Sequence, residues 1–250
     1  MLKEERHNII LTEIKTHRRV YSTALSKLLD VSEDTVRRDL HELARTGHVR
    51  KVHGGAMVNN NGNHLLEQKS FSPEDTGRMR IAEKASQCVL PNSVILMDGG
   101  LINLKVVEFL PTDFAATIFT NSLQVATKLT DYPQMETILL GGRLSHLHRI
   151  TTGMDVIQSL AEIHADLCLM EVTSVHDEVG LSENDKDIAN TKKAMIRSSS
   201  QVTAMCTYDH IGTMQPFRVC PINAVHSIIT ESEPKGNGLE SLASKGVRIL

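Results

Sequence analysis

The stretch VSEDTVRRDL, residues 31–40, has the pattern of an amphipathic helix that begins just after a capping residue. The hydroxyl of Ser32 can cap the free N–H groups of a helix start, so we expect the helix to begin after it. We expect it to run to about Thr46 and to stop at Gly47, a residue type that favours the backbone of a helix end. Its inward-facing positions recur every three or four residues and are Val36, Leu40 and Leu43.

Two further helices are predicted upstream of this stretch. The first covers residues 4–17, and a break follows at residues 18–20. Ser22 is a candidate N-cap for a short second helix, which ends at a turn formed by Asp30 and Val31. The apolar residues near helical spacing are expected to face inward and are Ile9, Ile10, Leu11 and Ile14 in the first helix and Ala24, Leu25, Leu28 and Leu29 in the second.

Downstream, the run HVRKVH at residues 48–53 alternates in character and ends in Gly54 and Gly55. Alternation followed by glycines predicts a strand of a short hairpin. Three helices and a basic hairpin in this order predict a winged helix-turn-helix over residues 1–57.

Such a domain points to DNA binding. The exposed start of the last helix meets base edges in the major groove, and basic side chains of the wing hold the phosphate backbone. For any single residue a plainer interpretation stays open, because Arg37 and Arg38 can form ion pairs with acidic neighbours on a solvated helix surface. The order of the elements favours DNA binding for the set as a whole. The candidate DNA-binding residues are Ser22, Ser32, Glu33, Asp34, Thr35, Arg37, Arg38, Arg50, Lys51 and His53.

Composition and charge restrict the class of protein. Residues 1–60 carry a formal charge of +3 and the remainder −6, which suits a nucleic-acid partner for the N-terminal part, although a solvated face explains so small a difference equally well. We expect a cytoplasmic protein without a membrane partner, since no secretory leader or apolar run of about 20 residues is present. We expect no metal and no cofactor, because His146 and His148 lack further ligands at useful spacing. The cysteines form no close pairs and are expected to be reduced core thiols; they are Cys88, Cys168, Cys206 and Cys220.

The rest of the chain has a different organisation. Residues 58–75 are polar and rich in Asn, which predicts a linker. From residue 76 to 250, short apolar runs alternate with helical patterns, which predicts an α/β domain with a mostly parallel sheet. In that architecture ligands bind beyond the carboxyl ends of the strands. The expected strands lie within residues 93–97, 117–119, 137–140, 167–170, 202–205 and 227–229.

Residues 6–56, above all the stretch at 31–40 and HGGA at 53–56, resemble the head of the DeoR family of bacterial repressors. The resemblance covers nearly the whole chain. It implies a repressor of carbohydrate or nucleoside catabolic genes that binds double-stranded operator DNA as a homo-oligomer and associates with the nucleoid when bound. It also implies a body similar in fold to ribose-5-phosphate isomerase that senses a phosphorylated sugar. The motifs that carry it in the body are Asp98-Gly99-Gly100, residues 120–123, Gly141-Gly142, Gly153, Gly180-Leu181, residues 192–196 and Asp209.

The body departs from the family pattern where a phosphate would be held. Gly100 is followed by Leu101 and Ile102, whereas the family has small hydroxyl residues that would complete a phosphate cradle. Glu171 stands where the family commonly has glycine, and Ile211 where it has lysine. These departures predict that the pocket binds a neutral or cationic ligand, or that small-molecule sensing is lost.

We expect an effector pocket formed by polar residues and glycines at strand ends and adjacent helix starts. Arg143 or Lys192 could replace the missing phosphate partner. Each polar residue alone also suits a cap or turn. The candidate effector-binding residues are Asp98, Gly99, Gly100, Asn121, Gly141, Gly142, Arg143, Glu171, Lys192 and Asp209.

Two other functions stay open beside a ligand-controlled regulator. The first is a sugar-phosphate isomerase-like activity with Asp98 and a lysine as acid/base groups, which the departures at the phosphate site oppose. The second is a ligand-independent DNA-binding oligomer. We expect a regulator rather than an enzyme.

Overall fold

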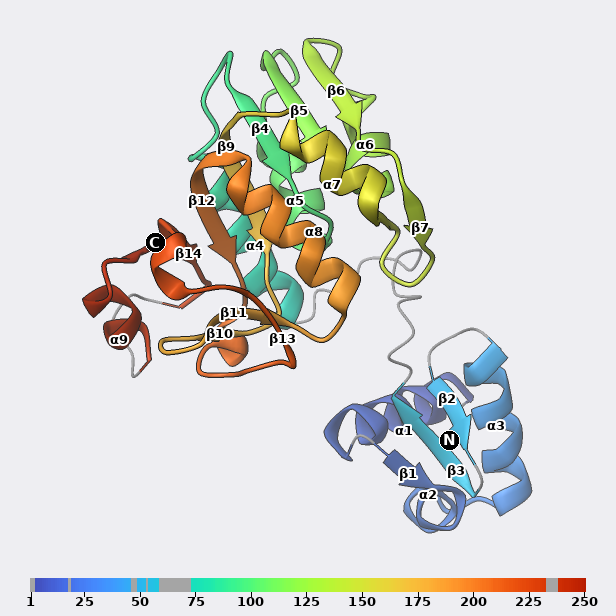
Figure 1. Ribbon diagram of the computed structural model, residues 1–250. Coiled ribbons are helices and arrows are strands. Elements are labelled where there is room, and N and C mark those ends of the chain that lie inside the picture. The colour runs from blue at the N-terminus through green and yellow to red at the C-terminus, as the bar shows by residue number, and fades with distance from the viewer. Residues whose placement is uncertain (1–2, 18, 46–48, 53, 59–72, 233–237) are drawn as a thin grey trace. The chain divides into compact units, whose positions relative to one another are not determined.

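The computed structural model describes residues 3–17, 19–45, 49–52, 54–58, 73–232 and 238–250. The chain divides into two compact units, Met1–Ser70 and Phe71–Leu250, called the head and the body below (Figure 1). The linker predicted over residues 58–75 lies largely outside the described residues and stays a prediction, as do the helix stop at Gly47 and the role of His53. Among the described residues, no helix combines the length and apolar character that crossing a bilayer requires.

The described part of the head has three helices and a three-stranded antiparallel sheet of order β1-β3-β2. Ala56 of the central strand lies opposite Val20 on one side and Lys51 on the other. A Cβ atom on Gly55 would lie 2.0 Å from the carbonyl oxygen of Val20, so this close approach requires glycine. The elements are α1 (Lys3–His17), β1 (Arg19–Tyr21), α2 (Ser22–Leu29), α3 (Glu33–Arg45), β2 (Val49–Val52) and β3 (Gly55–Val58).

The apolar stripe predicted for the third helix is confirmed. Val36, Leu40 and Leu43 are all buried, in one cluster with Ile10 and Ile14 of α1. The predicted hairpin after α3 is also confirmed, as β2 and β3. The break predicted after α1 contains the strand β1, which is too short for a periodic pattern to indicate.

Three expectations for the first two helices are wrong. The N-cap residue of α2 is Tyr21 rather than Ser22, and no side-chain hydrogen bond caps this helix. Ala24 and Leu28 are exposed, because a helix of two turns presents only a narrow stripe to the core. Ile9 in α1 is likewise 38% exposed.

The body is built on a seven-stranded parallel sheet of order β15-β14-β12-β9-β4-β5-β6, which confirms the predicted α/β class. It includes all six predicted strands and adds β15. Strands β10, β11 and β13 form a second small sheet, and β7 and β8 a hairpin. The strands are β4 (Val94–Met97), β5 (Ala116–Thr120), β6 (Met135–Leu139), β7 (Arg143–Ser145), β8 (Ile150–Thr152), β9 (Ala165–Glu171), β10 (Val175–His176), β11 (Gly180–Glu183), β12 (Ser199–Met205), β13 (Phe217–Cys220), β14 (Ser227–Ile229) and β15 (Arg248–Ile249). The helices are α4 (Pro73–Ser86), α5 (Leu101–Phe109), α6 (Leu123–Leu129), α7 (Met154–Ala161), α8 (Lys186–Arg197) and α9 (Leu239–Ser244), with 3₁₀ turns at Tyr208–His210 and Ile222–Ala224.

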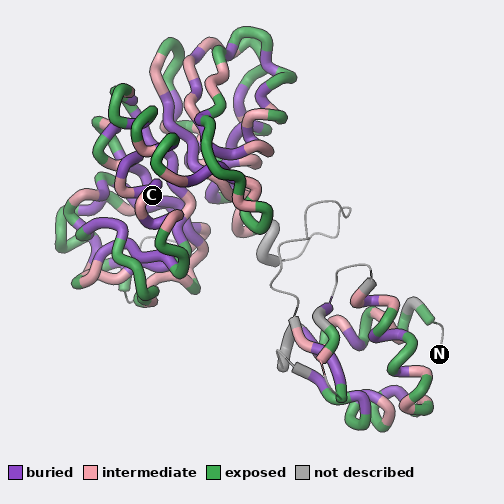
Figure 2. The backbone as a smooth tube through the Cα atoms, turned by 45° about the vertical axis from the view of Figure 1, so that its right-hand side comes forward, coloured by how far each residue is buried: buried purple, intermediate pink, exposed green. Residues whose placement is uncertain are grey.

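Both faces of the large sheet are covered by helices. Ile95 and Met97 of β4 belong to a core with α4, α5 and α6, whereas Leu96 belongs to a core with α7 and α8. This alternation follows from the two-residue period of a strand, and burial on both faces explains why β4 is apolar along its whole length. Figure 2 shows the buried stretches of the body in purple. Because the strands are parallel, their carboxyl ends meet at one edge, where Asp98 follows β4 and Asn121 follows β5.

Candidate functional site

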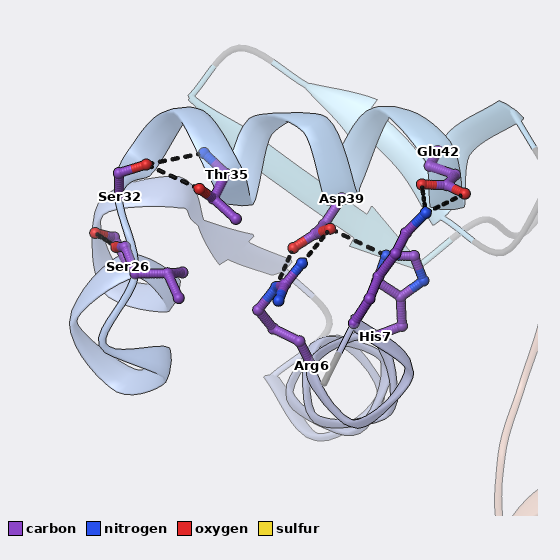
Figure 3. Close-up of polar contacts among 9 residues, drawn as sticks. Arg6, His7, Ser26, Ser32, Thr35, Asp39 and Glu42 are labelled. Carbon is purple, nitrogen blue, oxygen red and sulfur yellow. Dashed lines mark hydrogen bonds and ion pairs between the residues drawn. The ribbon is translucent and has the colours of Figure 1, made fainter. Parts of the chain in front are cut away.

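The start of α3 has the cap that the sequence predicts. The Ser32 hydroxyl oxygen accepts a hydrogen bond from the Thr35 backbone N–H at 3.2 Å, and the two side-chain hydroxyls lie 2.9 Å apart (Figure 3). Ser32 precedes the first turn of α3 and Thr35 lies within that turn. The cap fixes where the helix begins and therefore which side chains its first turn exposes.

The polar face of α3 carries two exposed ion pairs, and each of them joins residues one helical turn apart. Arg37 lies 3.5 Å from Glu33, and Arg38 lies 2.7 Å from Asp34. The Arg38 side chain is 81% exposed and that of Arg37 64%, so these pairs are weak and easily exchanged for contacts to another molecule. Surface ion pairing and DNA binding are therefore compatible, because weak pairs of this kind can break when the arginines contact DNA.

Two hollows lie beside α3, and basic residues of the helix and the wing line both. One hollow, of about 550 Å³, is lined by Arg37, Arg38, His41, Glu42 and Lys51. The second, of about 390 Å³, also takes in Ser22, which is only 4% exposed. The structure therefore brings Ser22, Arg37 and Lys51 together. Arg50 lies in β2, and the structure does not describe its side chain.

A partly buried ion pair joins α3 to α1. The Arg6 guanidinium donates two hydrogen bonds to the Asp39 carboxylate, at 2.5 and 3.0 Å, and His7 lies 3.2 Å from the same carboxylate (Figure 3). Burial alone would raise the pKa of Asp39, but the hydrogen bonds from Arg6 and His7 outweigh it and hold this pKa below its usual range. Asp39 is 3% exposed. This contact ties α3 to α1, and the residues around Arg6 and Asp39 in the sequence do not indicate it.

In the body, Lys192 is the centre of a buried charge cluster. Its ammonium group donates to the carboxylate of Glu183 and to the Glu171 carbonyl oxygen at 2.6 Å, and lies 3.3 Å from the Asp98 carboxylate. Burial favours the neutral amine, but the two carboxylates outweigh it and raise the pKa of Lys192. Two buried carboxylates, those of Asp98 and Glu183, thus balance the charge of the lysine. Lys192 is in the middle of α8 rather than at a helix start, and Glu183 has no motif that would have identified it.

Glu171 ends β9 and reaches across to the start of α5. Its Oε2 atom accepts a hydrogen bond from the Ile102 backbone N–H at 2.8 Å. Burial raises the pKa of Glu171 to about 7, although this hydrogen bond and the charges of Lys192 and Arg78 act in the opposite direction. The Ile102 side chain is buried in the core, so its backbone rather than its side chain serves this contact.

The other predicted pocket residues are placed in different ways. Asn121 is fully buried and donates to the Thr151 carbonyl oxygen. Arg143 is exposed and forms an ion pair with Asp187. Asp209 is exposed and accepts a hydrogen bond from the nearby Thr207 hydroxyl. The contacts of Glu171 and Lys192 thus gather Asp98, Gly100, Glu171 and Lys192 into one region. Arg143 instead pairs with Asp187 of α8, and Asp209 contacts only its neighbour Thr207 among the hydrogen bonds of the described residues.

A winged helix-turn-helix with an exposed polar helix start, joined to an α/β body with a polar edge, defines a DNA-binding transcriptional regulator. The comparisons with known families agree. The DeoR C terminal sensor domain matches residues 74–232, and the DeoR-like helix-turn-helix domain matches residues 6–61. The chain belongs to the DeoR family of transcriptional regulators, as its resemblance to that family implies.

Relatives match over the whole length. The chain is 29% identical over 257 residues to the HTH-type transcriptional repressor GlcR of Bacillus subtilis (strain 168), which covers all of this chain and 96% of that protein. It is 24% identical over 249 residues to the glycerol-3-phosphate regulon repressor of Escherichia coli (strain K12), over all of this chain and 99% of that one. Among solved structures, ribose 5-phosphate isomerase A from Neisseria gonorrhoeae has a TM-score of 0.40 and 14% identity, over 57% of this chain and 55% of that chain.

Proposed function

We propose that this protein is a transcriptional repressor that binds operator DNA through α3 and the β2–β3 wing and regulates carbohydrate genes. The observation that carries this proposal is the exposed, capped start of α3 on a helix fastened by the Arg6–Asp39 ion pair. A recognition helix must keep its orientation while its exposed side chains form contacts with DNA. The Arg6–Asp39 pair supports the orientation of α3, and its capped first turn leaves the polar side chains exposed. The relatives named as repressors support the sign of regulation.

In the proposed mode of binding, contacts divide between base edges and phosphates. Ser32, Glu33, Asp34, Thr35 and Arg38 face the bases, whereas Ser22, Arg37, Arg50, Lys51 and His53 hold the backbone on either side. Phosphate contacts supply affinity that depends on salt but not on sequence, and base contacts supply the discrimination.

The body is proposed to bind a small-molecule effector at the edge formed by Asp98, Asn121, Glu171 and Lys192, and to join copies of the chain into an oligomer in the cytoplasm. A ligand shifts operator affinity only as far as it binds two states of the protein differently. An isomerase activity is not favoured. Lys192 forms ion pairs with both Asp98 and Glu183, so neither Asp98 nor Lys192 is free to transfer a substrate proton.

Genome-wide footprinting of the DNA bound by the full chain tests the proposal. We expect discrete protected sites upstream of carbohydrate genes, and raised transcripts of those genes when the protein is removed. Protection that is uniform along the genome, or transcripts that stay unchanged, would contradict it.

A further inference from the structure

The start of α5 is a place where the chain itself supplies a negative charge. The first N–H groups of a helix have no acceptor within the helix, and together with the helix dipole they attract anions. Here the acceptor for Ile102 is the Glu171 carboxylate, at 2.8 Å. Gly100 is the N-cap residue of α5 and caps it with no side chain of its own.

The strand pairing explains why Glu171 reaches this helix. Met97 of β4 is paired with Leu169 of β9, and Glu171 ends β9 two residues beyond this pair, near the turn that leads from β4 into α5. The carboxyl group then lies directly on the backbone of the turn. A Cβ atom on Gly100 would lie 2.1 Å from Glu171 Oε2 and 2.5 Å from its Cδ atom, so carboxylate and backbone leave no space between them.

The nearest buried cation does not offer a second place for an anion. Lys192 donates to Glu183 and to the Glu171 carbonyl oxygen and lies 3.3 Å from the Asp98 carboxylate, so two buried carboxylates already balance its positive charge. An external anion would therefore have to displace the Glu171 carboxylate from the start of α5, and it would still be repelled by that nearby negative charge. By contrast, the fully buried Asn121 has a side-chain oxygen that accepts no hydrogen bond from the described residues, and such an oxygen suits a donor such as a hydroxyl group.

We propose that the Glu171 carboxylate is a resident anion at the start of α5 that excludes phosphorylated ligands and selects an uncharged, hydroxyl-bearing effector. This inference rests on the proposed function, since it names the ligand class of the same body site. Glu171 acts as a specificity-determining residue, and its replacement by glycine opens the helix start to an external anion.

Sulfate is a suitable probe because it remains a dianion from pH 6 to 8. Calorimetric titrations use the full chain at pH 8 and constant ionic strength. We expect Glu171→Gly to bind sulfate at least about tenfold more tightly than the wild type. The control Glu162→Gln removes one exposed carboxylate after α7 and should behave like the wild type. Equal sulfate affinity of the wild type and Glu171→Gly would overturn the proposal.

A second measurement serves if the glycine variant folds poorly. The groups that act on Glu171 electrostatically are Lys192 on α8, Arg78 on α4 and Asp98 after β4. Because protonation removes the resident charge, wild-type sulfate affinity should rise from pH 8 to pH 6, and Glu171→Gln should lack this part of the rise. The same slope in both proteins would overturn the proposal.

Operator binding without added anions separates this inference from the proposed function. If Glu171→Gly binds sulfate more tightly but no specific operator is found, the proposal for Glu171 is supported and the proposed regulatory function is refuted. If operator binding is specific but the sulfate affinities are equal, only the resident anion is refuted.

Discussion

Arg6 and Asp39 join α1 to α3 through two parallel hydrogen bonds, from Nε to Oδ2 at 2.5 Å and from Nη2 to Oδ1 at 3.0 Å. The two side chains are 13% and 4% exposed. A guanidinium and a carboxylate match in this geometry, which fixes orientation as well as distance. The rotation of α3, and thus the set of side chains it presents, depends on this contact.

Asp39→Asn should destabilise the head by about 2 kcal/mol, because it removes the charge-assisted hydrogen bonds of the partly buried Arg6. Hydrogen exchange of the α1 and α3 amides in the full chain measures this change for the head alone. Glu42→Gln is the control. Glu42→Gln breaks the ion pair with Lys3, in which the Lys3 side chain is 54% exposed and the Glu42 side chain 41%. It should lower the stability of the head by less than about 1 kcal/mol. Similar losses of stability in both variants would refute a special role for the Arg6–Asp39 pair.

The same carboxylate predicts a loss of head stability in acid. The pKa of Asp39 is lowered in the folded protein, so its stabilising contribution is complete above the unfolded value of about 3.9 and disappears as the pH falls through the folded value. Protection of the α3 amides should therefore be lost below about pH 4 in the wild type. Asp39→Asn should lack this step, and an unchanged acid limb in the variant would count against the assignment.

Arg38→Ala and Lys51→Ala should weaken DNA binding in different ways. If Arg38 meets a base, its loss should cost about 1–3 kcal/mol on the operator and much less on random DNA. Lys51→Ala should weaken both and reduce the salt dependence by about one phosphate contact. Anisotropy titrations at several salt concentrations distinguish the two, and equal losses on both DNAs for Arg38→Ala would remove it from the base-reading set.

Glu171→Gln should remove a destabilisation of the body at high pH. A carboxyl group whose pKa is raised to about 7 contributes full stability below its unfolded value of about 4.3, and this contribution is lost as the pH rises through 7. After allowance for partial exposure, the variant should gain about 1–2 kcal/mol over the wild type at pH 8 and little at pH 5. Calorimetric melting of the full chain at both pH values checks this, and a gain of the same size at pH 5 would contradict it.

Lys192→Met should destabilise the body by about 3–5 kcal/mol, because Asp98 and Glu183 would remain buried without their cation. Arg143→Ala, which breaks an exposed pair with Asp187, is the matched control and should have little effect. Calorimetric melting compares the two. A stable Lys192→Met body would show that the cluster does not depend on the lysine charge.

Sequence patterns predicted those helices and strands that depend mainly on interactions between residues close together in the chain. The Ser32 cap and the stripe at Val36 and Leu40 could be predicted because both depend on residues within one or two helical turns. The six main strands were apolar enough to recognise. By contrast, β1 and β15 have too few residues to show a period.

Contacts between residues far apart in the sequence could not be predicted from local patterns. Arg6 and Asp39 are 33 residues apart, and nothing in either neighbourhood marks the other as its partner. Glu183 was missed because its role arises only when α8 packs on β9 and β11. Glu171 could be singled out as unusual, but its hydrogen bond to Ile102 depends on the pairing of β4 with β9.

The most direct test of the central claim is an anisotropy titration of the full chain against a recovered operator fragment and a scrambled fragment of equal length and composition, at physiological salt. We expect the affinity for the operator to be at least about a thousandfold greater than the affinity for the scrambled fragment. Equal affinity for the two fragments would contradict it.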